Sequence, residues 1–215
     1  MAVQPTRPVP PVQPQLAPLD PSEMSANQLV RRRRLLDAVI ELVADGDDED
    51  MQMRDIAERA DVALGTVYRY FSSKDHLLAA ALVAWASELQ PPARRLPDGP
   101  PAERLVEVLR RALRAYRRRP AFARVLVHVA HSTDLHASEC YRELGPVVFD
   151  TLGAAISDVE PDTRARVMAV VGAVWYHCLV EWTNGRMSVT DVESTLESAC
   201  RLVLPPSAGG PTENC

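Results

Sequence analysis

Apolar residues recur every three or four positions along most of the chain, the spacing that places them on one face of a helix. In residues 27–44, for example, Leu35, Leu36, Val39 and Val43 share one face. Alternation with a period of two, typical of strands, is rare, and Ala, Leu, Arg and Glu dominate. The pattern predicts an all-α fold.

Breaks in the pattern divide the chain into nine predicted helices. Asp45-Gly46 ends the first helix, Asp61 tolerates the left-handed conformation of a tight turn, and Ser72-Ser73 offers a hydroxyl cap for the next helix. The predicted helices cover residues 27–44, 53–60, 63–70, 74–90, 102–118, 120–132, 137–157, 162–184 and 188–203.

Proline and glycine mark the predicted boundaries between larger units. Seven prolines lie in residues 1–21, and a second Pro- and Gly-rich break covers residues 91–101. The helices before and after that break form two groups. We therefore expect a Pro-rich disordered tail, two helical domains and a flexible tail, over residues 1–27, 28–90, 91–204 and 205–215.

Composition limits the classes of protein to which the chain can belong. With 47% hydrophobic and 25% charged residues and a formal net charge of -5, it is neither an intrinsically disordered chain nor a strongly basic coat protein. A DNA-binding protein with local positive charge stays possible. The apolar stretches are too short or too interrupted to span a membrane, and no secretory signal begins the chain, so we expect a cytoplasmic protein.

Residues 56–78 carry the most informative motif. Two short helices joined by a tight turn and followed by a long helix form the pattern of a helix-turn-helix unit. Val62, Val67 and Phe71 are expected to pack inward. The residues expected to face outward are Leu64, Gly65, Thr66, Tyr68, Arg69 and Tyr70.

The outward residues have the chemistry that a DNA groove requires. Arg69 can donate two hydrogen bonds to a guanine edge, Leu64 can contact a thymine methyl group, and Gly65 permits close approach. A second set offers hydrogen-bonding groups for phosphates, which position a protein without reading sequence. This set is Thr66, Tyr68, Tyr70 and Lys74.

The motif closely resembles that of the TetR family of bacterial transcriptional regulators over residues 31–80, including Gly65-Thr-Val-Tyr-Arg-Tyr-Phe71 and Lys74. The resemblance implies that residues 63–70 are the recognition helix of a homodimer that binds a double-stranded, pseudo-palindromic operator. Gln52, Asp61 and Ala63 depart from the family's usual cap and turn residues. The full set of expected DNA contacts is Arg31, Arg32, Gln52, Leu64, Gly65, Thr66, Tyr68, Arg69, Tyr70 and Lys74.

DNA binding requires local positive charge because residues 1–90 contain 9 basic and 14 acidic residues, five of the acids lying in residues 45–50. Arg31 to Arg34, Arg69 and Lys74 form the expected positive surface. The alternative for residues 31–34 is an ordinary solvated helix start.

The TetR resemblance also implies a ligand cavity in residues 91–204 and a dimer interface formed by the last two helices. The candidate cavity residues are Leu109, Leu113, Tyr116, Phe122, Leu126, Val129, Phe149, Leu152, Trp175 and Leu179. Each of these has core packing as its alternative role, because apolar stripes are how helices bury a face. Six arginines in residues 110–119 could hold the phosphates of a CoA group or simply form a solvated basic face.

A looser similarity connects the chain with an actinobacterial branch of the family that includes a repressor of cholesterol catabolism. This similarity is carried by residues 51–54, 59–63, 65–71, 74, 76–78 and 188–192. It implies a small hydrophobic effector, a steroid or a fatty acyl-CoA, that releases a repressor from its operator.

Two alternatives to an effector-responsive repressor remain. One is a ligand-independent DNA-organising protein of the same fold. The other is a metal-responsive regulator, for which the only ligand types that cluster are His128, His131, His136, Glu139 and Cys140. No Gly-rich phosphate loop, HExxH or GxSxG motif is present, so we expect neither an enzyme nor a cofactor.

Overall fold

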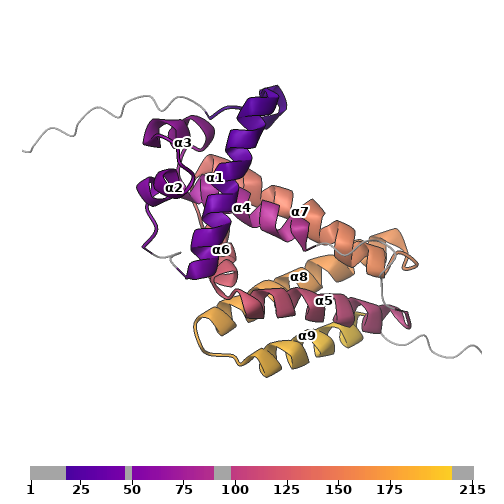
Figure 1. Cartoon of the computed structure of the whole chain (residues 1–215). Coiled ribbons are helices and arrows are strands. Elements are labelled where there is room, and N and C mark those ends of the chain that lie inside the picture. The colour runs from indigo at the N-terminus through magenta and orange to yellow at the C-terminus, as the bar shows by residue number, and fades with distance from the viewer. Residues whose placement is uncertain (1–17, 47–49, 90–97, 205–215) are drawn as a thin grey trace, which may run out of the picture.

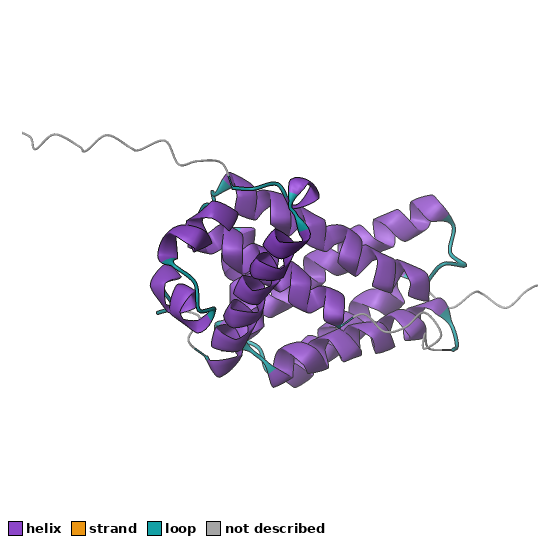
Figure 2. Ribbon diagram, turned by 45° about the horizontal axis from the view of Figure 1, so that its top comes forward, coloured by secondary structure: helices purple, strands orange, loops and turns teal. Residues whose placement is uncertain are grey.

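The structure is a computed structural model that describes residues 18–46, 50–89 and 98–204, except for the side chain of Phe149. These residues form nine α-helices and one short 3-10 helix, with no strand, which confirms the all-α prediction (Figures 1 and 2). The elements are η1 (Pro21–Glu23), α1 (Ala26–Asp45), α2 (Met53–Arg59), α3 (Leu64–Tyr70), α4 (Lys74–Glu88), α5 (Pro101–Arg118), α6 (Ala121–Ala130), α7 (Leu135–Ala155), α8 (Pro161–Thr183) and α9 (Val189–Val203).

Each predicted helix is present, with ends within two residues of the expected ones. The residues that end or begin these helices are those that the sequence indicated. Gly46 closes α1 in the left-handed conformation at φ 95°, and Asp61 adopts the same conformation at φ 52° between α2 and α3. The Ser73 hydroxyl accepts the His76 N–H at 3.0 Å and caps α4.

The described part of the expected first tail belongs to the folded unit. The backbone N–H of Leu19 donates to the carbonyl of Arg69 at 3.1 Å, and Leu19 and Met24 pack against the core. This bond satisfies a carbonyl at the C-terminal end of α3 that has no partner within its own helix. Residues 1–17 and 205–215, also expected to be tails, lie outside the described residues.

The helices form three groups, with α4 and α7 between the other two. In Figure 1, α1, α2 and α3 lie together at one end, α4 and α7 cross the centre, and α5, α8 and α9 lie below them. Helix α4 packs against α1, α6 and α7, while α9 packs against α5 and α8. Helix α4 is thus in contact with both halves of the chain.

One hydrophobic cluster runs through both halves. It includes Leu35 and Val39 of α1, Phe71, Leu82 of α4 and Phe122 of α6, each at most 1% exposed. The run of alanines at residues 79–81 is also buried, since small side chains allow neighbouring helices to approach α4 closely. The position of α4 therefore depends on packing against α6 and α7 as well as against α1.

Within the described part of the chain, no helix is both long enough and apolar enough to cross a membrane.

Candidate nucleic-acid interface

Helices α2 and α3 form a helix-turn-helix unit whose inner face is closed. After Asp61, the Val62 N–H donates to the Ala57 carbonyl at 3.0 Å and turns the chain toward α3. Val67 and Phe71 are fully buried, and Val62 is partly buried against the same core. These three residues pack as expected, and their burial fixes which face of α3 points away from the protein.

The opposite face of α3 is open. Tyr68 is 47% exposed and Leu64 is 37% exposed, large values for apolar or aromatic side chains. A Cβ at Gly65 would meet no atom within 4 Å, so its side of the helix is free for another molecule. Arg69 is exposed, and its guanidinium has no hydrogen-bond or ion-pair partner among the described residues. Thr66, which follows Gly65, is half-buried.

The sequence predicted that Tyr70 faces outward, but the structure buries it. It is 3% exposed and belongs to the central hydrophobic cluster. The reason is helical periodicity, because residue 70 is three positions after the buried Val67 and so lies on the same face. The outward placement of Tyr70 was therefore wrong, and its burial argues against a phosphate contact.

The arginines at the start of α1 differ in their surroundings. Arg31 and Arg34 are exposed. Arg33 pairs with Asp37 at 2.7 Å and with Glu88 of α4. Arg32 lies over the Phe71 ring, 5.3 Å from its centroid, and is half-buried. Arg32 is thus directed inward. The exposed Arg31 and Arg34 therefore carry the positive surface expected from residues 31–34.

Two further expected DNA contacts, Gln52 and Lys74, lie at helix starts. Gln52 is exposed at the N-cap of α2, where its backbone N–H donates to the Asp55 carboxylate at 2.7 Å. Lys74 is half-buried in the first turn of α4, three residues after Phe71. At both helix starts a backbone N–H already has an acceptor, Asp55 for Gln52 and Ser73 for His76, so a phosphate contact falls to the Gln52 and Lys74 side chains.

The expected cavity residues form core rather than one cavity wall. Those with described side chains are at most 7% exposed, apart from the partly buried Trp175. They divide among three hydrophobic clusters: Leu109 and Leu152 in one, Leu113 in another, and Tyr116, Phe122, Leu126, Val129 and Leu179 in the third. The side chain of Phe149 lies outside the described residues.

Two hollows lie elsewhere on the described structure. One of about 430 Å³ lies between α1, α4 and α7, with Arg32 and Cys140 among its lining residues. One of about 290 Å³ lies beside α1 and is lined by Arg59 and Arg119 among others. None of the expected cavity residues lines either hollow.

The six arginines near the end of α5 are divided between two environments. Arg110 pairs with Glu197 at 2.6 Å, and Arg111 and Arg114 both pair with Glu107. The remaining three, Arg117 to Arg119, are exposed at the end of the helix.

The candidate metal ligands do not converge. His128 contacts Asp75, His131 contacts Tyr176, and His136 lies 3.4 Å from Glu139. In the described part of the chain, no group of three His, Cys, Asp or Glu residues could hold a metal ion.

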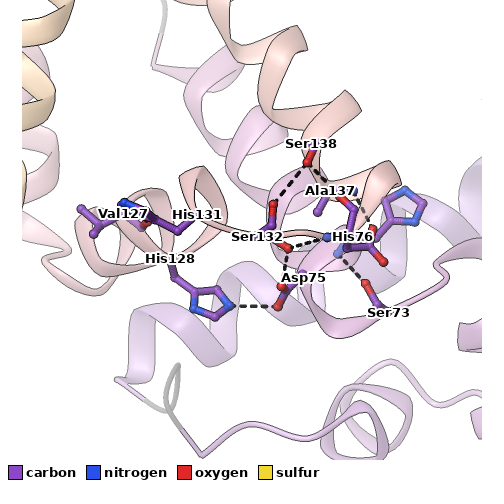
Figure 3. Close-up of polar contacts among 10 residues, drawn as sticks. Ser73, Asp75, His76, Val127, His128, His131, Ser132, Ala137 and Ser138 are labelled. Carbon is purple, nitrogen blue, oxygen red and sulfur yellow. Dashed lines mark hydrogen bonds and ion pairs between the residues drawn. The ribbon is translucent and has the colours of Figure 1, made fainter.

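A polar cluster between α4 and the α6–α7 turn was not found by the sequence analysis. The Asp75 carboxylate accepts hydrogen bonds from His128 and Ser132, which lie 53 and 57 positions away in the chain (Figure 3). Next to it, His76 is 8% exposed and its Nδ1 accepts the Ser72 N–H at 3.2 Å. The available signal was an acid placed directly after Lys74, a residue expected to contact phosphate.

An all-helical protein that presents one open face of a helix-turn-helix unit belongs to the class of DNA-binding transcription regulators. Residues 35–81 match the family model described as bacterial regulatory proteins, tetR family, and residues 99–203 match the tetracyclin repressor-like, C-terminal domain. The chain belongs to the TetR family, whose members are transcriptional regulators and not enzymes.

Relatives resemble the chain over most of its length. The HTH-type transcriptional repressor KstR of Rhodococcus jostii is 36% identical over 190 residues, which cover 87% of this chain and 90% of that protein. KstR of Mycobacterium tuberculosis is 33% identical over 193 residues, which cover 88% of each chain.

Solved structures share the fold. A TetR transcriptional regulator from Rhodococcus has a TM-score of 0.74 and 28% identity, covering 85% of this chain and 100% of that one. FadR of Thermus thermophilus, solved with lauroyl-CoA, has a TM-score of 0.65 at 21% identity, covering 84% and 98% of the two chains. At that identity, the likeness establishes the common fold alone.

The environment of His76 predicts a dependence of stability on pH. Burial lowers the pKa of His76 to about 4, and the nearby His136 and Arg32 act in the same direction. The unfolded chain takes up this proton near pH 6.5, whereas the folded chain resists it, so stability falls as the pH drops from about 6.5 to 4. This single group should contribute at most about 3 kcal/mol to the loss.

We expect His76→Gln, which keeps a neutral acceptor, to gain stability relative to the wild type over that pH range. Urea unfolding at pH 7, 6, 5 and 4 measures the difference in the free energy of unfolding, with His131→Gln at an exposed position as the matched control. If the difference in unfolding free energy between the wild type and the variant stays constant with pH, the lowered pKa of His76 is contradicted.

Proposed function

We propose that this protein is a repressor that binds a pseudo-palindromic operator as a homodimer through α3 and is released by a small hydrophobic effector. The open face of α3, opposite the buried Val67 and Phe71, is the observation that carries the DNA-binding part. Leu64, Gly65 and Arg69 are proposed to contact bases. Thr66, Tyr68, Lys74, Gln52 and Arg31 are proposed to contact phosphates, which set the register on the duplex.

The proposed dimer forms through α8 and α9. Ala169, Ala173 and His177 of α8 recur at four-residue steps on an exposed face, with Val170 beside them 47% exposed. Ser194, Ser198 and Leu202 of α9 repeat the pattern, and Leu202 is 82% exposed. Small and apolar side chains allow two such faces to pack closely as a four-helix bundle. Such a dimer presents two α3 helices to successive major grooves.

The proposed effector is a steroid or a fatty acyl-CoA. The KstR relatives, which define the branch that includes a cholesterol-catabolism repressor, support this class. The FadR proteins of the same fold that were solved with stearoyl-CoA and lauroyl-CoA support the acyl-CoA alternative. Because the expected cavity residues are packed as core, an effector would have to displace them on entry.

Aromatic contacts provide a route from that core to α4. The Tyr116 and Trp175 rings lie 5.8 Å apart, Trp85 of α4 meets Tyr116 edge-on at 5.0 Å, and Trp85 stacks on Phe122 at 4.2 Å. An effector that separates Tyr116 from Trp175 would therefore shift α4, and α4 carries α3 at its start. DNA and effector would bind with reciprocally coupled affinities.

The burial of the expected cavity residues favours a second candidate, a ligand-independent DNA-organising protein. A protein of that kind needs no cavity, and its DNA affinity would not respond to small molecules.

Arg69→Ala should weaken binding to the preferred duplex by about 1 to 3 kcal/mol and relax sequence preference, because the variant loses a two-pronged contact with a base. Lys74→Ala is the matched control and should weaken all duplexes alike and flatten the salt slope by about one unit. Fluorescence anisotropy with specific and scrambled duplexes measures both. Unchanged preference in Arg69→Ala would exclude a base-reading role.

Ala173→Arg should convert the dimer to a monomer, because it places like charges across a symmetric interface that excludes water. Light scattering after gel filtration measures the mass, and operator affinity should fall with it because a monomer contacts one half-site. Ala154→Arg, an exposed alanine of α7, is the control. A variant that remains dimeric would place the interface elsewhere.

Fatty acyl-CoAs, steroid acids or steroid acyl-CoAs should raise the melting temperature of the wild-type protein, whereas divalent metals should not. A ligand at one hundred times its dissociation constant adds about 2.7 kcal/mol, or about 5 to 10 °C for a chain of this size. The ligand that stabilises should also release the duplex in the anisotropy assay. No shift from any lipid would favour the ligand-independent candidate.

A further inference from the structure

The corner between α3 and α4 leaves little freedom between the two helices. Helix α3 ends at Tyr70 and α4 begins at Lys74, so three residues connect them. Phe71 is fully buried, and the Ser73 hydroxyl accepts the His76 N–H at 3.0 Å. Whatever holds the first turn of α4 in place therefore also holds the C-terminal end of the recognition helix.

Asp75 holds this first turn against the second half of the chain. Its Oδ1 lies 2.9 Å from His128 Nε2 on α6, and its Oδ2 accepts a hydrogen bond from the Ser132 hydroxyl in the α6–α7 turn (Figure 3). The Asp75 side chain is 30% exposed. Burial raises the pKa of Asp75, but the hydrogen bonds from Ser132 and His128 outweigh it and bring the pKa below its ordinary value. The carboxyl group is therefore ionised.

One partner of Asp75, Ser132, is itself bonded to the start of α7. The Ser132 hydroxyl also accepts the Asp134 N–H at 3.2 Å, and the Asp134 side chain caps α7 by accepting the Ala137 N–H at 2.8 Å. Next to Asp75, His76 stacks on His136 of α7 with ring centroids 5.2 Å apart. The cluster thus connects the start of α4 with α6, the turn and α7.

The direction of the Asp75 side chain is informative. An acid next to Lys74, at the end of the unit proposed to meet phosphates, would repel DNA if it pointed outward. It points toward α6 and the α6–α7 turn instead. A carboxylate in the first turn also favours α4 through the helix dipole, but that interaction would require no partner on α6.

We propose that Asp75 is a positioning residue for DNA binding: through Ser132 and His128 it fastens the α3–α4 corner to the α6–α7 turn and holds α3 in a fixed orientation. This inference rests on the proposed function of α3. Preorganisation of the two recognition helices lowers the entropy lost when a dimer binds both half-sites. Asp75 thereby contributes to DNA affinity without touching DNA.

The test compares Asp75→Ala, Ser132→Ala and the double variant with the wild type. The probe is a duplex that the wild-type protein selects from a random library. Ser87→Ala is the matched control, since its hydroxyl lies on the same helix and bonds only the Val83 carbonyl. We expect Asp75→Ala and Ser132→Ala each to weaken affinity about threefold to tenfold, the size of one or two net hydrogen bonds. The double variant should be no weaker than Asp75→Ala, because both changes remove one connection.

The sign of the effect separates this proposal from a charge effect. Loss of a negative charge near DNA would by itself strengthen binding, so weaker binding by Asp75→Ala excludes a pure charge effect, and the same loss in the neutral Ser132→Ala separates positioning from the helix dipole of α4. The neutral Ser132→Ala should keep the wild-type salt slope, since phosphate contacts are retained.

Three results would overturn the proposal: tighter binding by Asp75→Ala, wild-type affinity in Ser132→Ala with only a lower melting temperature, or additive losses in the double variant. A wild-type protein that selects no duplex would instead refute the proposed function, and this inference with it.

Discussion

The hydrophobic core shared by the helix-turn-helix unit and the second half of the chain is the constraint on which the rest of the structure depends. Leu35, Phe71 and Phe122 belong to one continuous cluster, although they lie on α1, after α3 and on α6. Such close-packed cores have discrete arrangements and do not deform smoothly. Movement of α6 or α7 would therefore have to be accommodated by α4, and then by α3.

Helix α4 provides two different connections within this arrangement. Its C-terminal half enters the aromatic group of Trp85, Tyr116 and Phe122, where apolar packing dominates. Its first turn is held by the Asp75 carboxylate and by His76, where polar contacts dominate. Apolar contacts can be exchanged for others of similar volume with limited cost, whereas a hydrogen bond depends strongly on geometry. The first connection suits a ligand-responsive region, and the second suits accurate placement of α3.

The local features of the fold could be predicted from sequence because their causes are local. Helical periodicity gave all nine helices of the described residues, and Gly46 and Asp61 gave the ends at which the backbone becomes left-handed. The motif with Leu64, Gly65 and Arg69 likewise identified the face of α3 that the structure leaves open. The family assignment followed from that same short segment.

The features that the sequence analysis missed are non-local or depend on small rotations about a helix axis. Tyr70 was assigned outward by its hydrogen-bonding chemistry, although its position relative to Val67 places it inward. The role of the expected cavity residues toward an effector stays a prediction, and their division among three clusters depends on how the helices cross. Asp75 and Ser132 lie 57 positions apart, and no periodicity connects them. The contact of Leu19 with Arg69 is likewise invisible in a Pro-rich segment.

The most direct test of this account is to select DNA with the purified protein from a random duplex library and to sequence the recovered pool. If two α3 helices read successive major grooves, the recovered sequences will share an inverted repeat with half-site centres about 10 base pairs, or about 34 to 36 Å, apart. Recovered DNA that shares no inverted repeat and shows no enrichment of any sequence would contradict the claim that α3 reads an operator.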